Sequence, residues 1–157
     1  MADCGACSAC CYLMSVPSLK KPACLWCAHT SRPHGGCEIY ADRPNECVEY
    51  RCLWLVSQDR APEERMIADA RPDRSKVMLH DARDPDNPNR VYVHVFPDHP
   101  TAWLVEPIND HIKAMRSRGV TVQVMIGDRT IVLEPGGDER HVLEGPAERT
   151  AFRQLPV

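Results

Sequence analysis

The sequence contains no cysteine after residue 52, although nine cysteines lie at or before that residue. It also lacks a long apolar run, because "VYVHVF" and "VTVQVMI" are only strand length, so we expect no membrane-spanning segment. The start of the chain has neither the basic stretch nor the apolar stretch of a secretory signal, and we therefore expect a cytoplasmic location. The formal net charge of −3 shows no basic excess, so we expect no nucleic-acid partner.

Several catalytic motifs are absent as well. The sequence has no glycine-rich phosphate loop, no nucleophile elbow and no HExxH motif, and we assign no catalytic residue. Four scattered histidines, three of them beside an aspartate, lie in the cysteine-free part: His80, His94, His99 and His111, next to Asp81, Asp98 and Asp110. They could form a metal or acid–base site, but exposed histidines on strand edges and turns would give the same pattern. Whether the protein is an enzyme stays open.

The cysteines are crowded at the beginning of the chain, where residues 4–11 read "CGACSACC". The full set is Cys4, Cys7, Cys10, Cys11, Cys24, Cys27, Cys37, Cys47 and Cys52. A two-residue spacing, which lets two thiolates reach one metal ion across a tight turn, occurs three times. A disulfide framework fits poorly with an odd count and a reducing compartment, and ordinary buried thiols do not explain four cysteines in eight residues. We therefore predict that all nine are metal ligands.

The adjacent pair Cys10 and Cys11 indicates more than one metal ion, because neighbouring side chains diverge. Three zinc ions held by six terminal and three bridging thiolates would use all nine cysteines. The alternative is a [4Fe–4S] cluster on four cysteines, with zinc or free thiols elsewhere. His29 or His34 could replace a thiolate. A third possibility is a reactive-thiol or metal-transfer protein whose cysteines are only partly ligated.

An all-cysteine site would be anionic and should attract cations. The candidates in this third of the chain are Lys20, Lys21, Arg32, Arg43 and Arg51. Such a site has no open coordination position for water or substrate, so zinc catalysis is not expected.

Two motifs resemble a known family. "C-x-x-C-x-x-C-C" at Cys4 to Cys11 and "G-C-x-I-Y-x-x-R-P-x-x-C" at Gly36 to Cys47 are similar to those of the YkgJ-like cysteine-cluster proteins, also called the CxxCxxCC family. That family is described as zinc- or iron-chelating, without an established reaction. The resemblance covers residues 4 to about 55. It implies the ligands Cys4, Cys7, Cys10, Cys11, Cys37 and Cys47, and the supporting residues Ile39, Tyr40, Arg43 and Pro44. One departure is Val48, where family members commonly carry arginine.

Around the second motif we predict one helix from Pro44, capped by Asp42, to about Ser57. That helix would place Cys47 in its first turn and Cys52 about 140° further around its axis. A second short helix is predicted from Pro62 to just before Pro72, within a polar linker.

The remainder alternates in the manner of β-strands at residues 76–82, 90–96 and 120–126, with a return strand after the turn at Gly127 and Asp128. A helix over residues 107–119 should bury Ile108, Ile112 and Met115. The expected fold class is α+β: an irregular cysteine-rich region with short helices, then a small antiparallel sheet with one packed helix in the order β-β-α-β-β. The predicted parts are residues 1–57, 58–75, 76–134 and a loosely ordered tail, 135–157.

The sequence thus predicts a metal-binding protein with a polynuclear zinc–thiolate cluster and a structural or metal-handling role. The cluster would replace the apolar core that a region of some 50 residues with few aliphatic side chains can scarcely build, since structural zinc contributes about 10–16 kcal/mol in small peptides. Metal ions are the expected partners, and a protein partner is possible but unidentified. The alternative is an iron–sulfur protein with a redox or protein-modifying role.

Overall fold

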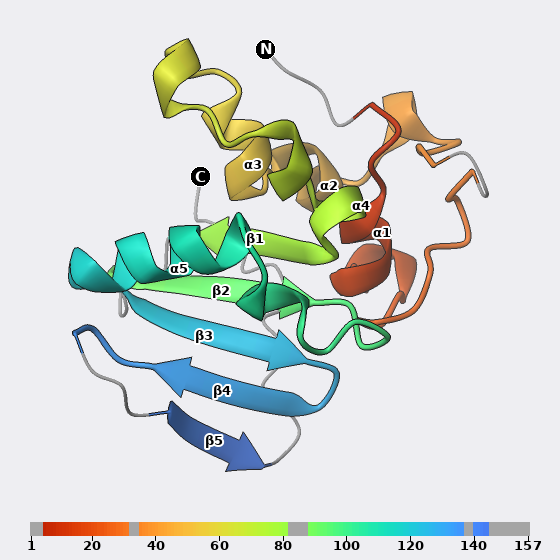
Figure 1. The fold of residues 1–157 in the computed structure, drawn as a ribbon. Helices are drawn as coiled ribbons and strands as arrows, with labels where there is room; N and C mark the ends of the chain where they lie inside the picture. The colour runs from red at the N-terminus through yellow and green to blue at the C-terminus, as the bar shows by residue number, and fades with distance from the viewer. Residues whose placement is uncertain (1–4, 32–34, 82–87, 137–139, 145–157) are drawn as a thin grey trace.

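A mixed five-stranded sheet with short helices forms the fold of the computed structural model, which describes residues 5–31, 35–81, 88–136 and 140–144 (Figure 1). The strands lie in the sheet in their sequence order: β1 (Val77–Asp81), β2 (Arg90–Val95), β3 (Thr121–Ile126), β4 (Arg129–Leu133) and β5 (Arg140–Glu144). The predicted combination of helices with a sheet is therefore confirmed. None of the helices in the described part of the chain is long and apolar enough to cross a bilayer.

The prediction that the sheet is antiparallel throughout is wrong. Strands β2 and β3 run parallel, while the other neighbouring pairs are antiparallel. The helix α5 (Ile108–Ser117) lies between β2 and β3 in the chain and returns it to the edge at which β2 began. Such a crossover gives parallel strands, whereas a tight turn would give antiparallel ones.

The described part of the predicted tail contains a strand, and residues 137–139 and 145–157 lie outside the described residues. Residues Arg140–Glu144 pair with β4 as an antiparallel edge strand. Backbone hydrogen bonds to the open edge of β4 support this strand, and its sequence "RHVLE" is too short to show a clear alternation.

The main apolar core lies between the sheet and α5. Its fully buried members include Val93, Val122 and Val124 from the sheet, with Ile108 and Ile112 from α5. Burial of one such side chain contributes about 1.5–3 kcal/mol. The predicted apolar stripe of α5 is confirmed, and its third residue, Met115, packs on the same core while partly exposed.

Short helices gather at the β1 edge of the sheet (Figure 1). They are α1 (Ala9–Leu13), η1 (Pro17–Leu19), η2 (Tyr40–Asp42), α2 (Asn45–Glu49) and α3 (Leu53–Ser57). A second apolar cluster joins this region to β1: Ala9, Leu13, Met14, Cys52, Leu55 and Met78. The domain boundary predicted after residue 57 stays a prediction, and contacts between α3 and β1 span it.

The single helix predicted from Pro44 to Ser57 is wrong. The chain forms two helices, α2 and α3, because Tyr50 and Cys52 between them have extended backbones. No side chain, Asp42 included, caps the start of α2 with a hydrogen bond. In a continuous helix the side chains of Tyr50 and Cys52 would point about 200° apart. The break instead lets both side chains reach the second apolar cluster, while Tyr50 also lines a pocket of cysteines. Tertiary packing overrides helix propensity here.

The helix predicted from Pro62 to Pro72 is also wrong. The segment forms two 3₁₀ turns, η3 (Pro62–Glu64) and η4 (Ala68–Ala70), followed by α4 (Pro72–Ser75). Pro72 begins α4 rather than following a helix, which is the position at the first turn that proline tolerates best.

Candidate metal centre

Six cysteines line one pocket, which we call the cysteine pocket: Cys7, Cys10, Cys11, Cys27, Cys37 and Cys47. Its cavity volume is about 80 Å³, and each of the six side chains is partly buried. Separate pieces of chain supply them, from the N-terminal turn and α1, through two loops, to the first turns of α2. None of the eight described cysteines forms a disulfide. The fold therefore gathers thiols that are far apart in the sequence.

Backbone contacts hold the loops of the cysteine pocket together. The N–H of Cys27 donates to the carbonyl oxygen of Cys11 over 2.9 Å, which joins the second loop to α1. Cys37 forms an isolated antiparallel bridge with Thr30, which brings the third loop onto the second. These contacts fix the relative positions of three of the six thiols without using the side chains.

Gly35 allows the third loop to approach the N-terminal turn. Its φ of +77° lies in the left-handed region, and a Cβ built on it would stand 2.0 Å from the carbonyl oxygen of Ala6. No side chain fits at that distance. Gly35 is therefore the residue that permits Cys37 and Cys7 to line the same pocket.

A buried lysine lies beside the pocket. Lys21 is only 7% exposed, and its ammonium group donates to the carbonyl oxygens of Tyr12, Met14 and Pro22. Burial lowers the pKa of Lys21, while the nearby thiols, Cys27 and Cys11 foremost, favour its charged form. A buried ammonium group is uncommon without anionic neighbours, so Lys21 provides positive charge next to the thiols.

Cys11 is the thiol whose ionisation the pocket favours most clearly. A hydrogen bond from Cys10 lowers the pKa of Cys11 to about 6, and Thr30, Lys21 and Arg43 add smaller effects in the same direction, against burial. The Thr30 hydroxyl lies close to this sulfur, although it makes no hydrogen bond of ordinary geometry. These contacts favour the thiolate form of Cys11.

Cys47 behaves in the opposite way. Burial, together with charge on Cys11 and Cys27, raises the pKa of Cys47 to about 11. Thiolates packed this closely repel one another, and a nearby metal cation removes that penalty by deprotonating its ligands outright.

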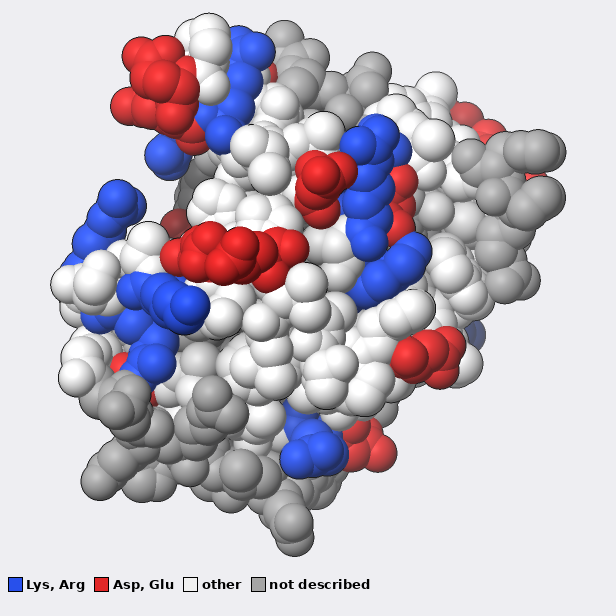
Figure 2. All heavy atoms as spheres, viewed as in Figure 1, with Lys and Arg blue, Asp and Glu red and all other residues white. Residues whose placement is uncertain are grey.

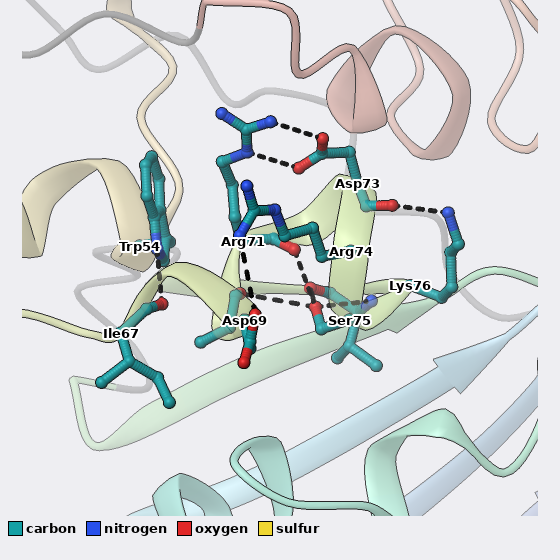
Figure 3. A network of polar contacts seen from close by, with 10 residues as sticks. Trp54, Ile67, Asp69, Arg71, Asp73, Arg74, Ser75 and Lys76 are labelled. Carbon is teal, nitrogen blue, oxygen red and sulfur yellow. Dashed lines mark hydrogen bonds and ion pairs between the residues drawn. The ribbon is translucent and has the colours of Figure 1, made fainter.

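Cys7 interacts with a segment outside the cysteine-rich region. Burial raises the pKa of Cys7, and the negative charge of Asp73 adds to that rise, whereas the backbone N–H groups of Ala9 and Asp73 and the positive charge of Arg71 oppose it. Asp73 is held by Arg71 through two hydrogen bonds of 2.6 and 2.7 Å (Figure 3). Backbone N–H groups that donate to a sulfur commonly orient and stabilise metal-bound thiolates.

The same segment is anchored to α3. The indole Nε1 of Trp54 donates to the carbonyl oxygen of Ile67 over 3.1 Å, and the Arg71 guanidinium lies 5.9 Å from the Trp54 ring centre (Figure 3). The sequence pattern of this stretch predicts only a polar linker. Asp73, Thr30 and Tyr50 were all missed as neighbours of the thiols, since no spacing rule connects them to a cysteine.

The remaining predicted ligands lie elsewhere. Cys24 lines a separate cavity of about 20 Å³, and Cys52, 9% exposed, belongs to the second apolar cluster. His29 does not line the cysteine pocket, and its carbonyl oxygen accepts a hydrogen bond from Glu38. Cys4 and His34 lie outside the described residues.

The supporting residues that the family resemblance implied do line the cysteine pocket: Ile39, Tyr40, Arg43 and Pro44. The Arg43 guanidinium stacks on the Tyr40 ring at 3.6 Å and donates to the Tyr40 carbonyl oxygen. Of the predicted cations, Lys21 and Arg43 act on the thiols.

As the side chains stand, no three His, Cys, Asp or Glu residues in the described ranges are close enough to hold one metal ion. The six thiols share a pocket without converging on one point. A cysteine that changes its side-chain rotamer moves its sulfur by roughly 3 Å.

Charge on the molecular surface is mixed. On the face shown in Figure 2, acidic and basic side chains are interspersed over a largely uncharged surface, without an extended patch of one sign among the residues described there.

No protein-family model, curated protein or solved structure matches this chain. The likeness to the CxxCxxCC family consequently rests on the two motifs alone and stays a prediction.

Proposed function

We propose that this protein binds metal ions through thiolates in the cysteine pocket and holds them as a polynuclear zinc–thiolate cluster. The observation that carries the proposal is that six cysteines from separate parts of the chain line one pocket of about 80 Å³. Soft thiolate ligands favour zinc and iron–sulfur clusters over hard cations such as magnesium. A structural or metal-handling role follows, because sites filled by protein sulfur have no position for a substrate.

The described cysteines of the pocket suffice for two zinc ions, while Cys4 lies outside the described residues. Six thiolates complete two tetrahedral ions when four bind one ion each and two are shared by both. Cys24 and Cys52 would have to leave their present surroundings to take part in a cluster of all nine. The adjacent pair Cys10 and Cys11, both in the pocket, suits a shared cluster, in which one of the two can bridge.

Element-resolved metal analysis of anaerobically purified protein tests this proposal. We expect about two zinc ions per chain, and three would extend the cluster to all nine cysteines. Four iron atoms, with a brown colour and absorbance near 400 nm, would establish the iron–sulfur alternative instead. A native protein without metal that keeps its structure in a strong chelator would overturn the proposal.

Alkylation separates a saturated cluster from a set of reactive thiols. Zinc-bound thiolates are shielded, so labelling of the native protein should be slow and should accelerate when a chelator is added. Fast labelling of most thiols without a chelator would instead favour the third possibility, a reactive-thiol or metal-transfer protein.

A further inference from the structure

The motif Cys24-x-x-Cys27 is divided between two cavities. Cys27 lines the cysteine pocket, but Cys24 lines the smaller cavity of about 20 Å³, together with His94, Met14 and Met125. A cysteine pair of this spacing ordinarily serves one metal ion. Its division here shows that the smaller cavity has its own set of sulfur and nitrogen donors.

The sheet places two of these donors side by side. His94 on β2 and Met125 on β3 are direct partners in the parallel register, so their side chains lie on the same face of the sheet. Met14, at the end of α1, is 2% exposed and completes the wall opposite them. Both thioether side chains are therefore held in position by regular structure.

The burial of His94 is a second, independent observation that points to a ligand in the smaller cavity. Its imidazole is fully buried, and the ring nitrogen Nε2 has no hydrogen-bond partner. A buried polar atom without a partner costs free energy, which a bound ligand can recover. Burial, followed by the neighbouring His80, lowers the pKa of His94 to about 3.

Cys24 has an unusual backbone for its residue type. Its φ of +57° lies in the left-handed region, which residues with a side chain seldom adopt. Such conformations cluster at functional sites, where the surrounding structure imposes them. Here the left-handed turn directs the chain so that Cys24 lines the smaller cavity rather than the cysteine pocket.

We infer that Cys24, His94, Met14 and Met125 form a second metal site, which takes a soft monovalent cation such as Cu(I). Thiolate and thioether sulfur together with imidazole are donors that soft ions prefer. A monovalent ion on one thiolate is neutral, which suits a cavity with mainly apolar walls, whereas a divalent ion would leave a buried positive charge. A cavity of about 20 Å³ has room for one ion or one water molecule.

Anaerobic titration of the full-length protein with Cu(I), followed by NMR of ¹³C-methyl methionine, tests the inference. Met125 is the specific reporter, because Met14 also lines the cysteine pocket. We expect the Met125 methyl signal to shift until it saturates. The signal of Met115, which packs on the opposite face of the sheet, should stay unchanged.

Variants identify the ligands. His94→Gln and Cys24→Ser should each raise the Cu(I) concentration that shifts Met125 at least about 10-fold, the lower end of what loss of a mere supporting residue costs. His99→Gln, which alters an exposed histidine five residues away, is the matched control and should leave the titration unchanged. His94→Gln could also disturb the fold, so a second variant, Met125→Leu, conserves the side-chain volume. Its titration with Cu(I) is followed by the NMR shift of the His94 ring.

The inference is overturned if Met125 and the His94 ring do not respond to Cu(I) at concentrations that saturate the cysteine pocket. Equal responses in the wild type and in His94→Gln would also overturn it, as would a shift of Met125 by zinc at the same concentration. These signals belong to the smaller cavity, so the result is independent of whether the cysteine pocket binds zinc.

Discussion

Replacing Gly35 with alanine should weaken metal binding by the cysteine pocket more than the matched replacement at Gly36. Both glycines have positive φ angles, +77° and +95°, so alanine adds about 1–2 kcal/mol of backbone strain at either position. Only Gly35 meets an obstacle. Its new Cβ would lie 2.0 Å from the carbonyl oxygen of Ala6, whereas a Cβ at Gly36 has nothing within 4 Å.

The clash must displace the turn that carries Cys7. Ala6 has to retreat by at least 1.0 Å before the contact reaches 3.0 Å, the lower limit for real Cβ atoms. Overpacking of this kind costs about 1–3 kcal/mol beyond the strain. Because Cys7 follows Ala6 directly, we expect zinc affinity to fall roughly 10- to 100-fold, as when a supporting residue of a metal site is lost.

The measurements are zinc affinity, by competition with a chromophoric chelator, and the free energy of unfolding of the zinc-loaded protein. Gly36→Ala should lose stability through strain alone and keep its zinc affinity within a few fold. Equal zinc affinities for the two variants would refute the idea that the approach of Gly35 to Ala6 assembles the pocket.

Three further predictions concern the pocket and the sheet. Cys47→Ala should lower the zinc content per chain. Cys52→Ala should keep the zinc content and only destabilise the fold by about 1 kcal/mol, as small deletions in a core do. Equal zinc contents in the two variants would contradict the division of the two cysteines between the cysteine pocket and the second apolar cluster. Ile112 lies on the buried face of α5 and is 2% exposed, so Ile112→Ala should lower the free energy of unfolding by about 2–5 kcal/mol in denaturant titrations. An effect below 1 kcal/mol would argue against the core as described. Burial lowers the pKa of His80 from 6.5 to about 4, so the unfolded chain takes up the proton first and stability falls as the pH drops from 6.5 towards 4. Between pH 7.5 and 5, wild type should lose about 2 kcal/mol more than His80→Leu, and parallel losses would show that His80 does not titrate in this way.

The regular elements with a clear hydrophobic period were predictable from the sequence. Alternation identified β1 to β4, and the spacing of Ile108 and Ile112 identified α5. The parallel pairing of β2 and β3 was also implied by a helix between two strands of one sheet, but the sequence analysis did not draw that consequence. Strand β5 was missed because an edge strand depends on backbone pairing rather than on a side-chain pattern.

The candidate site was predictable as a composition but not as a geometry. Spacing identified the cysteines, and six of them line one pocket. Spacing could not show that the chain breaks between α2 and α3, which sends Cys52 into an apolar cluster. Nor could it connect Asp73 with Cys7, because their contact depends on how α4 packs against the N-terminal turn.

Each strand of the sheet pairs with the one that precedes or follows it in the sequence, so the sheet needs no long-range contact with the first seventy residues to assemble. During synthesis the cysteines leave the ribosome well before β1, the strand against which their region packs. In that interval the thiols are open to metals and oxidants alike. The order of synthesis therefore leaves the thiols without the packing of β1 for as long as that strand is still being made.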